Sequence, residues 1–413
     1  MHILWLKTEL LHPVDKGGRI RTYNMLRELC REHRVTYLTL DDGTAAPGAA
    51  ELAREYSHEL VRVPFQTAAK GSPRFFAELL RNVMSPLPYA VAKYESAEMR
   101  KSIIEHAARG ADVIVCDFLF PSLNVPDSLG VPTVLFQHNV EAVIWERHMQ
   151  IAESSVKKLY MRRQWQRMLR HEQAECRRFD HVIAVSDQDA DAFTREYGVT
   201  SVSEVPTGVD TQYFQADVTV PRRRNNIAFT GSMDWLPNED AIIWFTQSIL
   251  PLVQARIPDS TFTIVGRKPT ARILAMHGQN GIEVTGSVPD VRPYLNRAEV
   301  FVVPIRIGGG TRLKIYEAMA MGRAVVSTPV GAEGLPVVDG VHAMLRTEPQ
   351  DLADAIVTVL SNPQQREAIE RDSAALVREH YGWDGVARKF GDICQQVIDG
   401  PPGRKRRPQP VAS

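Results

Sequence analysis

Residues 307 to 322, which read IGGGTRLKIYEAMAMG, combine residue types that can hold a phosphate group. Gly308, Gly309 and Gly310 follow a short apolar run typical of a β-strand, and without Cβ atoms their backbone amides are open to close approach. Thr311 can cap the helix expected next, whose free amides and dipole favour an anion. The stretch therefore predicts an anion site.

Two charged side chains, Lys314 and Glu317, belong to the same expected helix and lie on one side of it, since they are one turn apart. One interpretation is that the glycines and Lys314 hold a diphosphate while Glu317 accepts hydrogen bonds from the attached ribose. The other is that Lys314 and Glu317 form an ordinary ion pair. These residues alone leave both interpretations open.

Bulk properties limit the class of protein. A chain of 413 residues predicts two domains, and equal numbers of basic and acidic residues, 49 each, give no argument for a nucleic-acid partner. The four cysteines lack metal or redox spacing, which indicates free thiols in a reducing compartment and no metal site. The chain opens directly on a strand-like run, with no signal peptide and no run long enough to span a bilayer. We therefore expect a cytoplasmic protein with at most peripheral membrane contact.

Short apolar runs alternate with helical stretches in both halves, as in parallel α/β sheets. Turn residues and a charge run interrupt the alternation near Val205, and it starts afresh after Arg224. We expect a first domain over residues 1–205, a second over 206–380, a last helix over 381–399, and a basic, Pro-rich, disordered tail over 400–413. Ligands of such sheets bind at the carboxyl ends of the strands, so a two-sided cleft follows.

The first half has its own glycine turn. Gly17 and Gly18 follow the first strand and open a helix expected from about Arg19 to Glu32. The spacing is not the GxGxxG fingerprint, which argues against a nicotinamide or flavin enzyme. The pair can contribute amides to a phosphate site or can form a plain tight turn.

Two segments combine basic and apolar side chains. Between Val156 and Arg178, eight Lys and Arg residues face only two Glu residues, with Leu159 and Trp165 among them. A helix of this kind either rests on an anionic membrane surface or packs, basic face outward, on its own domain. The apolar residues from Phe75 to Met84 form a second candidate patch.

Several ordered motifs resemble one known family. They are FTGSMDWLPNEDAIIWF, GIEVTGSVPDVRPYL and VFVVPIRIGGGTRLKIYEAMAMGRAVVSTPVGAEGL in the second half, with QHNVEAVIWER and PTGVDTQYF before them. Over roughly residues 2–395 the chain is similar to family 4 retaining glycosyltransferases, especially the bacterial polysaccharide-associated branch. The resemblance implies a GT-B fold: two facing Rossmann-like domains with a cleft between them, and a last helix that crosses back to the first domain.

The resemblance also implies roles for individual residues. Glu317 falls on the glutamate that binds the nucleotide ribose, Arg267 and Lys314 fall on basic residues that hold the diphosphate, and His138 falls on a histidine near the donor sugar. The alternative for His138 is a buried, hydrogen-bonded core histidine. The amide-bearing residues expected around the nucleotide are Gly17, Gly18, Gly231, Gly308, Gly309, Gly310 and Thr311.

The chain departs from the family pattern in two places. Counting back eight positions from Glu317, where the family commonly has a second glutamate, gives Gly309. The usual Lys-Gly after the first strand of the second domain is absent, and residues 237–240 read PNED. Lys314 or Arg267 must then supply the missing positive charge.

The implied reaction moves a sugar from a UDP- or GDP-sugar to a hydroxyl acceptor, with retention of configuration and without cofactor or metal. A lipid-linked or other glycan is the expected acceptor, in cell-surface polysaccharide or glycolipid biosynthesis. Two alternatives stay open: a nucleotide-sugar epimerase on the same fold, and a non-catalytic scaffold that binds nucleotide-sugar. The residues leave the base, the sugar and the linkage open.

Overall fold

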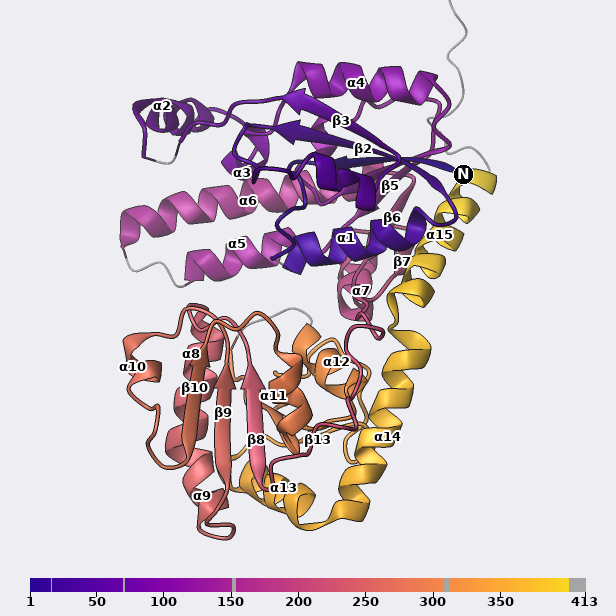
Figure 1. The fold of residues 1–413 in the computed structure, drawn as a ribbon. Helices are drawn as coiled ribbons and strands as arrows, with labels where there is room; N and C mark the ends of the chain where they lie inside the picture. Colours follow the sequence, from indigo (N-terminus) through magenta and orange to yellow (C-terminus); the bar gives the residue numbers. More distant parts are fainter. Residues whose placement is uncertain (16, 70, 151–153, 308–311, 401–413) are drawn as a thin grey trace, which may run out of the picture. The chain divides into compact units, whose positions relative to one another are not determined.

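A computed structural model describes residues 1–15, 17–69, 71–150, 154–307 and 312–400. The expectations placed on Gly308, Gly309, Gly310 and Thr311, and on the tail beyond residue 400, lie outside these ranges. The chain divides into two compact units (Figure 1): Met1–Pro206 with Val386–Ser413, and Thr207–Gly385. Along the described ranges, no helix combines the length and the apolar character needed to cross a bilayer.

A parallel sheet forms the centre of the first unit, with strand order β3-β2-β1-β4-β5-β6-β7. Its strands are β1 (His2–Lys7), β2 (Arg34–Asp41), β3 (Glu59–Pro64), β4 (Val113–Asp117), β5 (Thr133–Phe136), β6 (His181–Ala184) and β7 (Val202–Glu204). The helical segments are α1 (Gly17–Leu29), η1 (Glu51–Glu55), α2 (Pro73–Asn82), α3 (Tyr89–Ala92), α4 (Ala97–Ala108), η2 (Ser122–Asn124), α5 (Glu141–Gln150), α6 (Ser155–Arg178) and α7 (Asp187–Arg195).

Alternation along the strands explains how this sheet is covered on both faces. Leu4 and Leu6 of β1 pack with α4, α6 and α7 in one core cluster. Trp5 points the other way, where its ring contacts Phe390 of α15 (Trp383–Asp399) at 5.4 Å between centroids. From Val386 onward α15 belongs to the first unit. The expected return of the last helix to the first domain is therefore confirmed.

The second unit is built on another parallel sheet, with strand order β10-β9-β8-β11-β12-β13. Its strands are β8 (Asn226–Thr230), β9 (Thr261–Val265), β10 (Ile282–Gly286), β11 (Val300–Val303), β12 (Ala324–Ser327) and β13 (Met344–Leu345). The remaining helices are α8 (Leu236–Trp244), η3 (Phe245–Ile249), α9 (Leu250–Gln254), α10 (Ala271–Leu274), α11 (Arg292–Arg297), α12 (Leu313–Ala320), α13 (Pro349–Ser361) and α14 (Pro363–His380).

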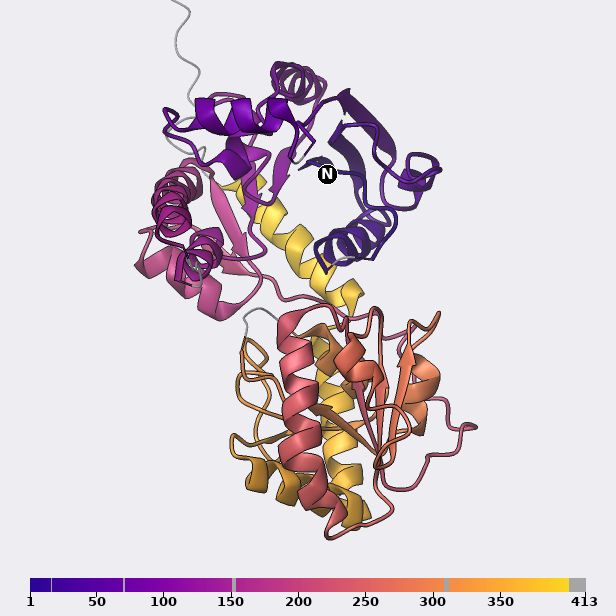
Figure 2. The same ribbon diagram turned by 90° about the vertical axis from the view of Figure 1, so that its left-hand side faces the viewer.

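The two faces of this second sheet again separate by residue parity. Val300 and Val302 of β11 pack with α8, η3, α9 and α13, whereas Phe301 and Val303 pack with α11, α12 and α14. Figure 2 shows α8, η3 and α9 as one continuous helix. The middle segment of that helix, η3, is π-helical. Pro251 lies two residues after this stretch, and in an ordinary α-helix a proline ring would clash with the carbonyl group four residues before it.

Most expected elements are present with small shifts at their ends. The first helix begins at Gly17, so the glycine pair does open it, but it ends at Leu29 rather than near Glu32. Helix α12 begins at Leu313, and Arg312 occupies its N-cap position without a side-chain capping bond. The start of this helix thus lies two residues beyond the expected capping residue. The short strands β7 and β13 were not expected.

Candidate functional site

The loops after β8 and β9 meet the start of α12 at the carboxyl edge of the second sheet. Gly231 follows β8, Gly266 and Arg267 follow β9, and Lys314 lies in the first turn of α12. A Cβ atom on Gly266 would lie 1.7 Å from the Gly231 carbonyl oxygen, and one on Gly231 would lie 2.8 Å from Lys314 Nζ. The two glycines therefore let these loops and the Lys314 ammonium group come together.

Lys314 is held by neutral groups. Its Nζ donates a hydrogen bond to Asn238 Oδ1 at 2.9 Å and lies 4.0 Å from the centroid of the Phe229 ring. The Asn238 amide in turn donates to the Ser232 carbonyl at 2.8 Å. No ion pair joins Lys314 to Glu317, although both side chains are described. The simple ion-pair interpretation of these two residues is therefore wrong.

The surroundings of both side chains disfavour their charged forms. Burial, with a contribution from Arg312, lowers the pKa of Lys314 to about 7. Burial raises the pKa of Glu317 to about 7, although Lys314 opposes that rise. An anion beside Lys314 would favour its ammonium form, and hydroxyl donors at Glu317 would favour its carboxylate. A ligand that carries both an anionic group and hydroxyl groups would therefore change the protonation of Lys314 and Glu317.

Two arginines lie near this edge. Arg267 is exposed, and its Nε donates to Ser232 Oγ at 2.9 Å. Arg312 is buried, with its guanidinium carbon 4.9 Å from the centroid of the Trp235 ring. Basic residues at a helix N-terminus oppose the helix dipole, so an anion would offset the unfavourable charge of Arg312 and Lys314 at the start of α12.

Sequence reasoning missed Arg312 and Asn238. The signal for Arg312 was available, since it stands beside Lys314 at the same helix start. Asn238 belongs to the PNED segment, which we interpreted as the loss of a phosphate cation. The structure shows in addition that this segment supplies the amide that holds Lys314.

The first unit gathers buried charges at the carboxyl edge of its own sheet. Asp117, at the end of β4, accepts hydrogen bonds from Lys7 Nζ at 2.7 Å and from Thr22 Oγ1 at 2.6 Å. Its other oxygen lies 2.7 Å from His138 Nε2. Asp117, Lys7 and His138 are all at most 3 % exposed. Burial lowers the pKa of His138 to about 3, so its imidazole is neutral at pH 7.

Aromatic contacts fix the His138 ring. Phe118 stacks on it with 3.8 Å between ring centroids, and Phe118 itself adopts a left-handed φ of 72°. His138 Nδ1 has no hydrogen-bond partner among the described residues. The structure thus shows the buried histidine of the alternative interpretation.

The expected site residues fall into three groups. Gly231, Arg267, Lys314 and Glu317 belong to the second unit, and the first three gather at one edge of its sheet. His138, Gly17 and Gly18 belong to the first unit, where a Cβ on Gly18 would lie 3.1 Å from the Phe118 ring. The triple glycine and Thr311 lie outside the described residues.

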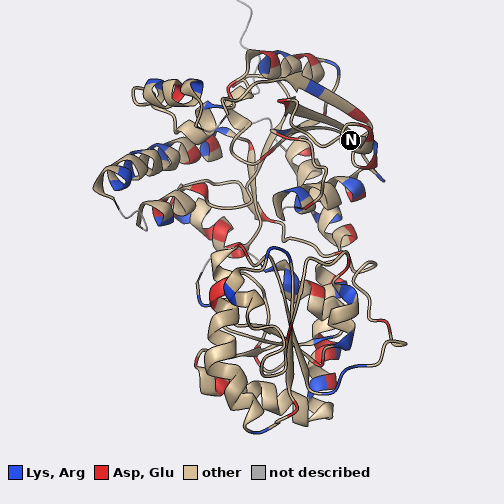
Figure 3. Ribbon diagram, turned by 60° about the vertical axis from the view of Figure 1, so that its left-hand side comes forward, with Lys and Arg blue, Asp and Glu red and all other residues tan. Residues whose placement is uncertain are grey.

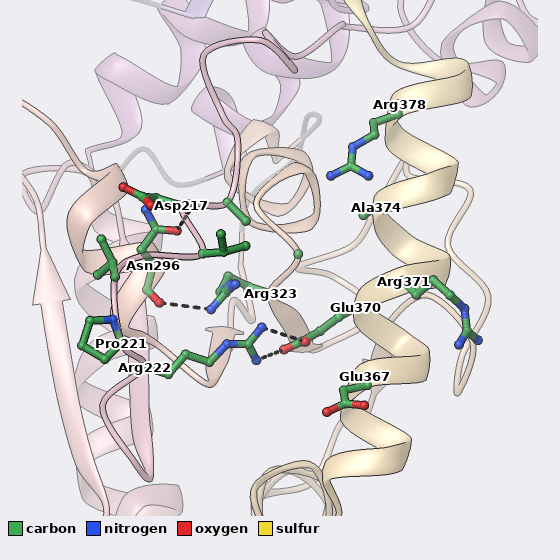
Figure 4. A pocket seen from close by; sticks show the side chains of 14 residues that line it. Asp217, Pro221, Arg222, Asn296, Arg323, Glu367, Glu370, Arg371, Ala374 and Arg378 are labelled. Carbon is green, nitrogen blue, oxygen red and sulfur yellow. Dashed lines mark hydrogen bonds and ion pairs between the residues drawn. The ribbon is translucent and has the colours of Figure 1, made fainter.

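A hollow of about 540 Å³ in the second unit is not part of this site (Figure 4). It lies at the opposite edge of the sheet, because Arg222 precedes β8 and Arg323 precedes β12. Arg222 is paired with Glu370 through hydrogen bonds of 2.6 and 3.0 Å. Arg323 donates to the carbonyl oxygens of Met321, Asn296 and Ala298. Arg222 therefore ties the loop before β8 to α14, and Arg323 ties the start of β12 to the end of α11.

Comparisons with known proteins agree with this architecture. The chain matches the model of Glycosyltransferase Family 4 over residues 16–213 and that of Glycosyl transferases group 1 over residues 224–362. An uncharacterized 44.6 kDa protein in the cps region of Klebsiella pneumoniae is 22% identical over 393 residues, which cover 92% of this chain and 96% of that protein.

The names of two further similar proteins state what they act on or bind. The phosphatidyl-myo-inositol mannosyltransferase of Mycobacterium tuberculosis is 29% identical over 228 residues, 52% of this chain and 59% of that enzyme. The crystal structure of HepE from Anabaena in complex with UDP has a TM-score of 0.66 at 15% identity, with 96% of this chain and 100% of that chain covered. The chain belongs to glycosyltransferase family 4 and is a nucleotide-sugar glycosyltransferase (EC class 2.4) with the GT-B fold.

Proposed function

We propose that this enzyme transfers a sugar from a UDP-sugar to a hydroxyl group of a lipid-linked glycan, with retention of the anomeric configuration. The observation that carries the proposal is the edge of the second sheet at which Lys314 and Arg267 flank Gly231, with Glu317 one turn further along α12. UDP is chosen over GDP because UDP is the nucleotide bound to the similar HepE structure.

In this proposal, Lys314 and Arg267 stabilise the departing diphosphate. As the bond between the anomeric carbon and the diphosphate breaks, negative charge grows on the leaving oxygen, and cations already in place stabilise that charge without reorganisation. The Glu317 carboxylate accepts hydrogen bonds from the ribose hydroxyls. The acceptor oxygen bonds to the anomeric carbon on the same face, and its proton passes to an oxygen of the diphosphate. His138 orients the donor sugar through its neutral imidazole.

The acceptor and the location complete the proposal. The named mannosyltransferase relative acts on phosphatidyl-myo-inositol, a lipid, which supports a lipid-linked acceptor in cell-surface polysaccharide or glycolipid synthesis. We place the enzyme in the cytoplasm, at the inner face of the membrane, where such an acceptor presents its headgroup.

A thermal-shift series with UDP, GDP and their sugars tests this assignment. At a concentration of a hundred times its dissociation constant, a bound ligand adds about 2.7 kcal/mol to the free energy of unfolding. UDP and one UDP-sugar are expected to stabilise the protein far more than GDP. Stabilisation by GDP alone would reject the choice of base, and no stabilisation by any nucleotide would reject the site.

Donor binding is also expected to change the number of bound protons. Lys314 is mostly uncharged above its pKa of about 7, and a diphosphate raises that pKa, so a proton is taken up at pH 8. Glu317 is mostly protonated below its pKa of about 7, and ribose donors lower that pKa, so a proton is released at pH 6. Calorimetry of UDP-sugar binding in buffers of different ionisation enthalpy measures both changes.

The matched control for this titration is Lys314→Met. It should abolish the uptake at pH 8 and leave the release at pH 6 in place. A binding enthalpy that does not depend on the buffer at either pH contradicts the assigned roles.

A further inference from the structure

A hollow of about 620 Å³ opens in the first unit beside the end of α2 and the outer half of α6. The two basic and apolar segments of the sequence, 75–84 and 156–178, thus meet in space. In Figure 3, the ribbon of the outer half of α6 is repeatedly blue, the colour of Lys and Arg. The lining residues are Met84, Ser85, Pro86, Leu159, Arg162, Arg163, Gln166, Arg167 and Arg170.

Arg167 brings a buried charge to this hollow. It is 5 % exposed, and its guanidinium donates to the carbonyl oxygens of Asn82 at 2.8 Å and Val83 at 2.7 Å. These neutral partners satisfy hydrogen bonds but do not balance the charge, and no described carboxylate lies within ion-pair distance of it. Buried charges are normally paired, so the surroundings of Arg167 are suited to binding an anion.

Three more guanidinium groups surround the same hollow. Arg162, Arg163 and Arg170 form no ion pair within the described part of the chain, and Arg170 Nε donates only to the Gln166 carbonyl oxygen at 3.2 Å. Burial and then the charges of Arg163 and Arg170 lower the pKa of Arg167. A phosphate group would relieve this repulsion, since guanidinium groups match its geometry with paired hydrogen bonds.

Three exposed side chains form an apolar rim beside the hollow. Met84 (87% exposed) and Leu159 (70%) line the hollow, and Leu80 (74%) lies near the end of α2, four residues before Met84. On α2, Leu80 lies one turn after Phe76, which is 60% exposed, while Phe75 turns inward and packs on Tyr89. Large, solvent-exposed apolar side chains on both sides of a cationic hollow are typical of a surface that binds the interface of a lipid bilayer.

We infer that this hollow receives the phosphate headgroup of an anionic membrane lipid while Leu80, Met84 and Leu159 enter the edge of the hydrocarbon. A soluble phosphate would satisfy the arginines but would leave the apolar rim in water. The inference rests on the proposed function in one respect, which is the lipid-linked acceptor. Binding of the headgroup would hold the first unit at the membrane surface, where that acceptor lies.

Flotation of the full chain with vesicles tests the inference. Phosphatidylcholine vesicles are compared with vesicles that also contain phosphatidylglycerol, and binding is expected only to the latter. Arg162→Ala, Arg163→Ala and Arg170→Ala combined should weaken vesicle binding about a hundred-fold, because each arginine near an anionic surface contributes about a factor of five. The combination Leu80→Ser, Met84→Ser and Leu159→Ser should also weaken vesicle binding.

A matched control removes the same charge elsewhere, from the exposed Arg109, Arg224 and Arg388. This triple alanine variant should bind nearly as well as the unchanged protein. Equal losses of vesicle binding in both arginine variants would show that binding depends only on the total charge of the protein. Full vesicle binding by the serine variant would show that the hollow binds phosphate without insertion of the apolar side chains. Either result, or binding that does not depend on phosphatidylglycerol, overturns the inference.

A second readout separates this inference from the proposed function. Thermal stabilisation by UDP should be the same in every variant, because none of the substituted residues lies at the edge that holds Lys314. Vesicle binding that follows the expected pattern without any UDP stabilisation would reject the donor site and leave the membrane site standing. Stabilisation by UDP without vesicle binding would reject the membrane site and leave the donor site standing.

Discussion

Replacing Lys314 by alanine is expected to lower the turnover number by about 10²–10³-fold, or about 2.7–4 kcal/mol of transition-state stabilisation. The affinity for the intact UDP-sugar should fall much less. The reason is that the donor diphosphate gains its full charge only as the sugar leaves, and the Lys314 ammonium, held by Asn238, is in place for that moment. Turnover and donor dissociation constant are measured separately, by product formation and by calorimetry.

Lys268 offers a matched control for this substitution. It follows Arg267 on the same loop, is exposed, and pairs with Asp234 at 3.1 Å. Lys268→Ala also removes one ammonium group from this region but should leave turnover within a few-fold of the original value. If Lys314→Ala weakens donor binding as strongly as it lowers turnover, Lys314 contributes uniform binding and not transition-state stabilisation.

Replacing Asp117 by alanine is expected to cost about 3–5 kcal/mol of the free energy of unfolding of the first unit. The substitution leaves the Lys7 ammonium, which is 2 % exposed, without its counter-charge. It also removes the acceptor of hydrogen bonds from Trp5 and Thr22. Urea unfolding, followed by a signal from the first unit, measures the loss.

The pH range of this effect follows from the pKa of Asp117. Burial alone would raise that pKa, but Lys7 and His138 outweigh burial and hold it below its ordinary value of 3.8. Because the folded-state pKa is depressed, the stabilisation is complete above pH 3.8 and is lost as the pH falls through the folded-state value. The comparison is therefore made near pH 7, where the whole effect is present.

A double substitution distinguishes loss of charge balance from loss of packing. Lys7→Met with Asp117→Asn removes both charges and keeps most of the volume, so it should be markedly more stable than Asp117→Ala alone. A double variant as unstable as the sum of its parts, or a single variant within about 1 kcal/mol of the original protein, would show that the pair carries little of the stability.

The sequence predicted the parallel sheets well because buried strands leave a plain signal. Runs such as Val300–Val303 and Thr261–Val265 are apolar, short and β-branched, and glycines mark the turns that follow them. Strands β7 and β13 escaped notice because three and two residues are too few for a pattern. The end of α1 was misplaced because apolar and charged residues continue past it without a break.

The site was less accessible from the sequence because its contacts join distant residues. Lys7 and Asp117 meet across 110 positions only because β1 and β4 are neighbours in the sheet, and strand order cannot be read from the strands themselves. Asn238 holds Lys314 from 76 positions away. In the same way, the segments on α2 and α6 were recognised separately, and their shared hollow depends on Arg167 reaching the carbonyls at the end of α2.

A crystal structure with bound UDP-sugar is the most direct test of the donor site. The diphosphate oxygens should lie about 3 Å from Lys314 Nζ, with the ribose hydroxyls donating to the Glu317 carboxylate. A nucleotide bound at any other place, with Lys314 still bonded to Asn238 alone, would contradict the account.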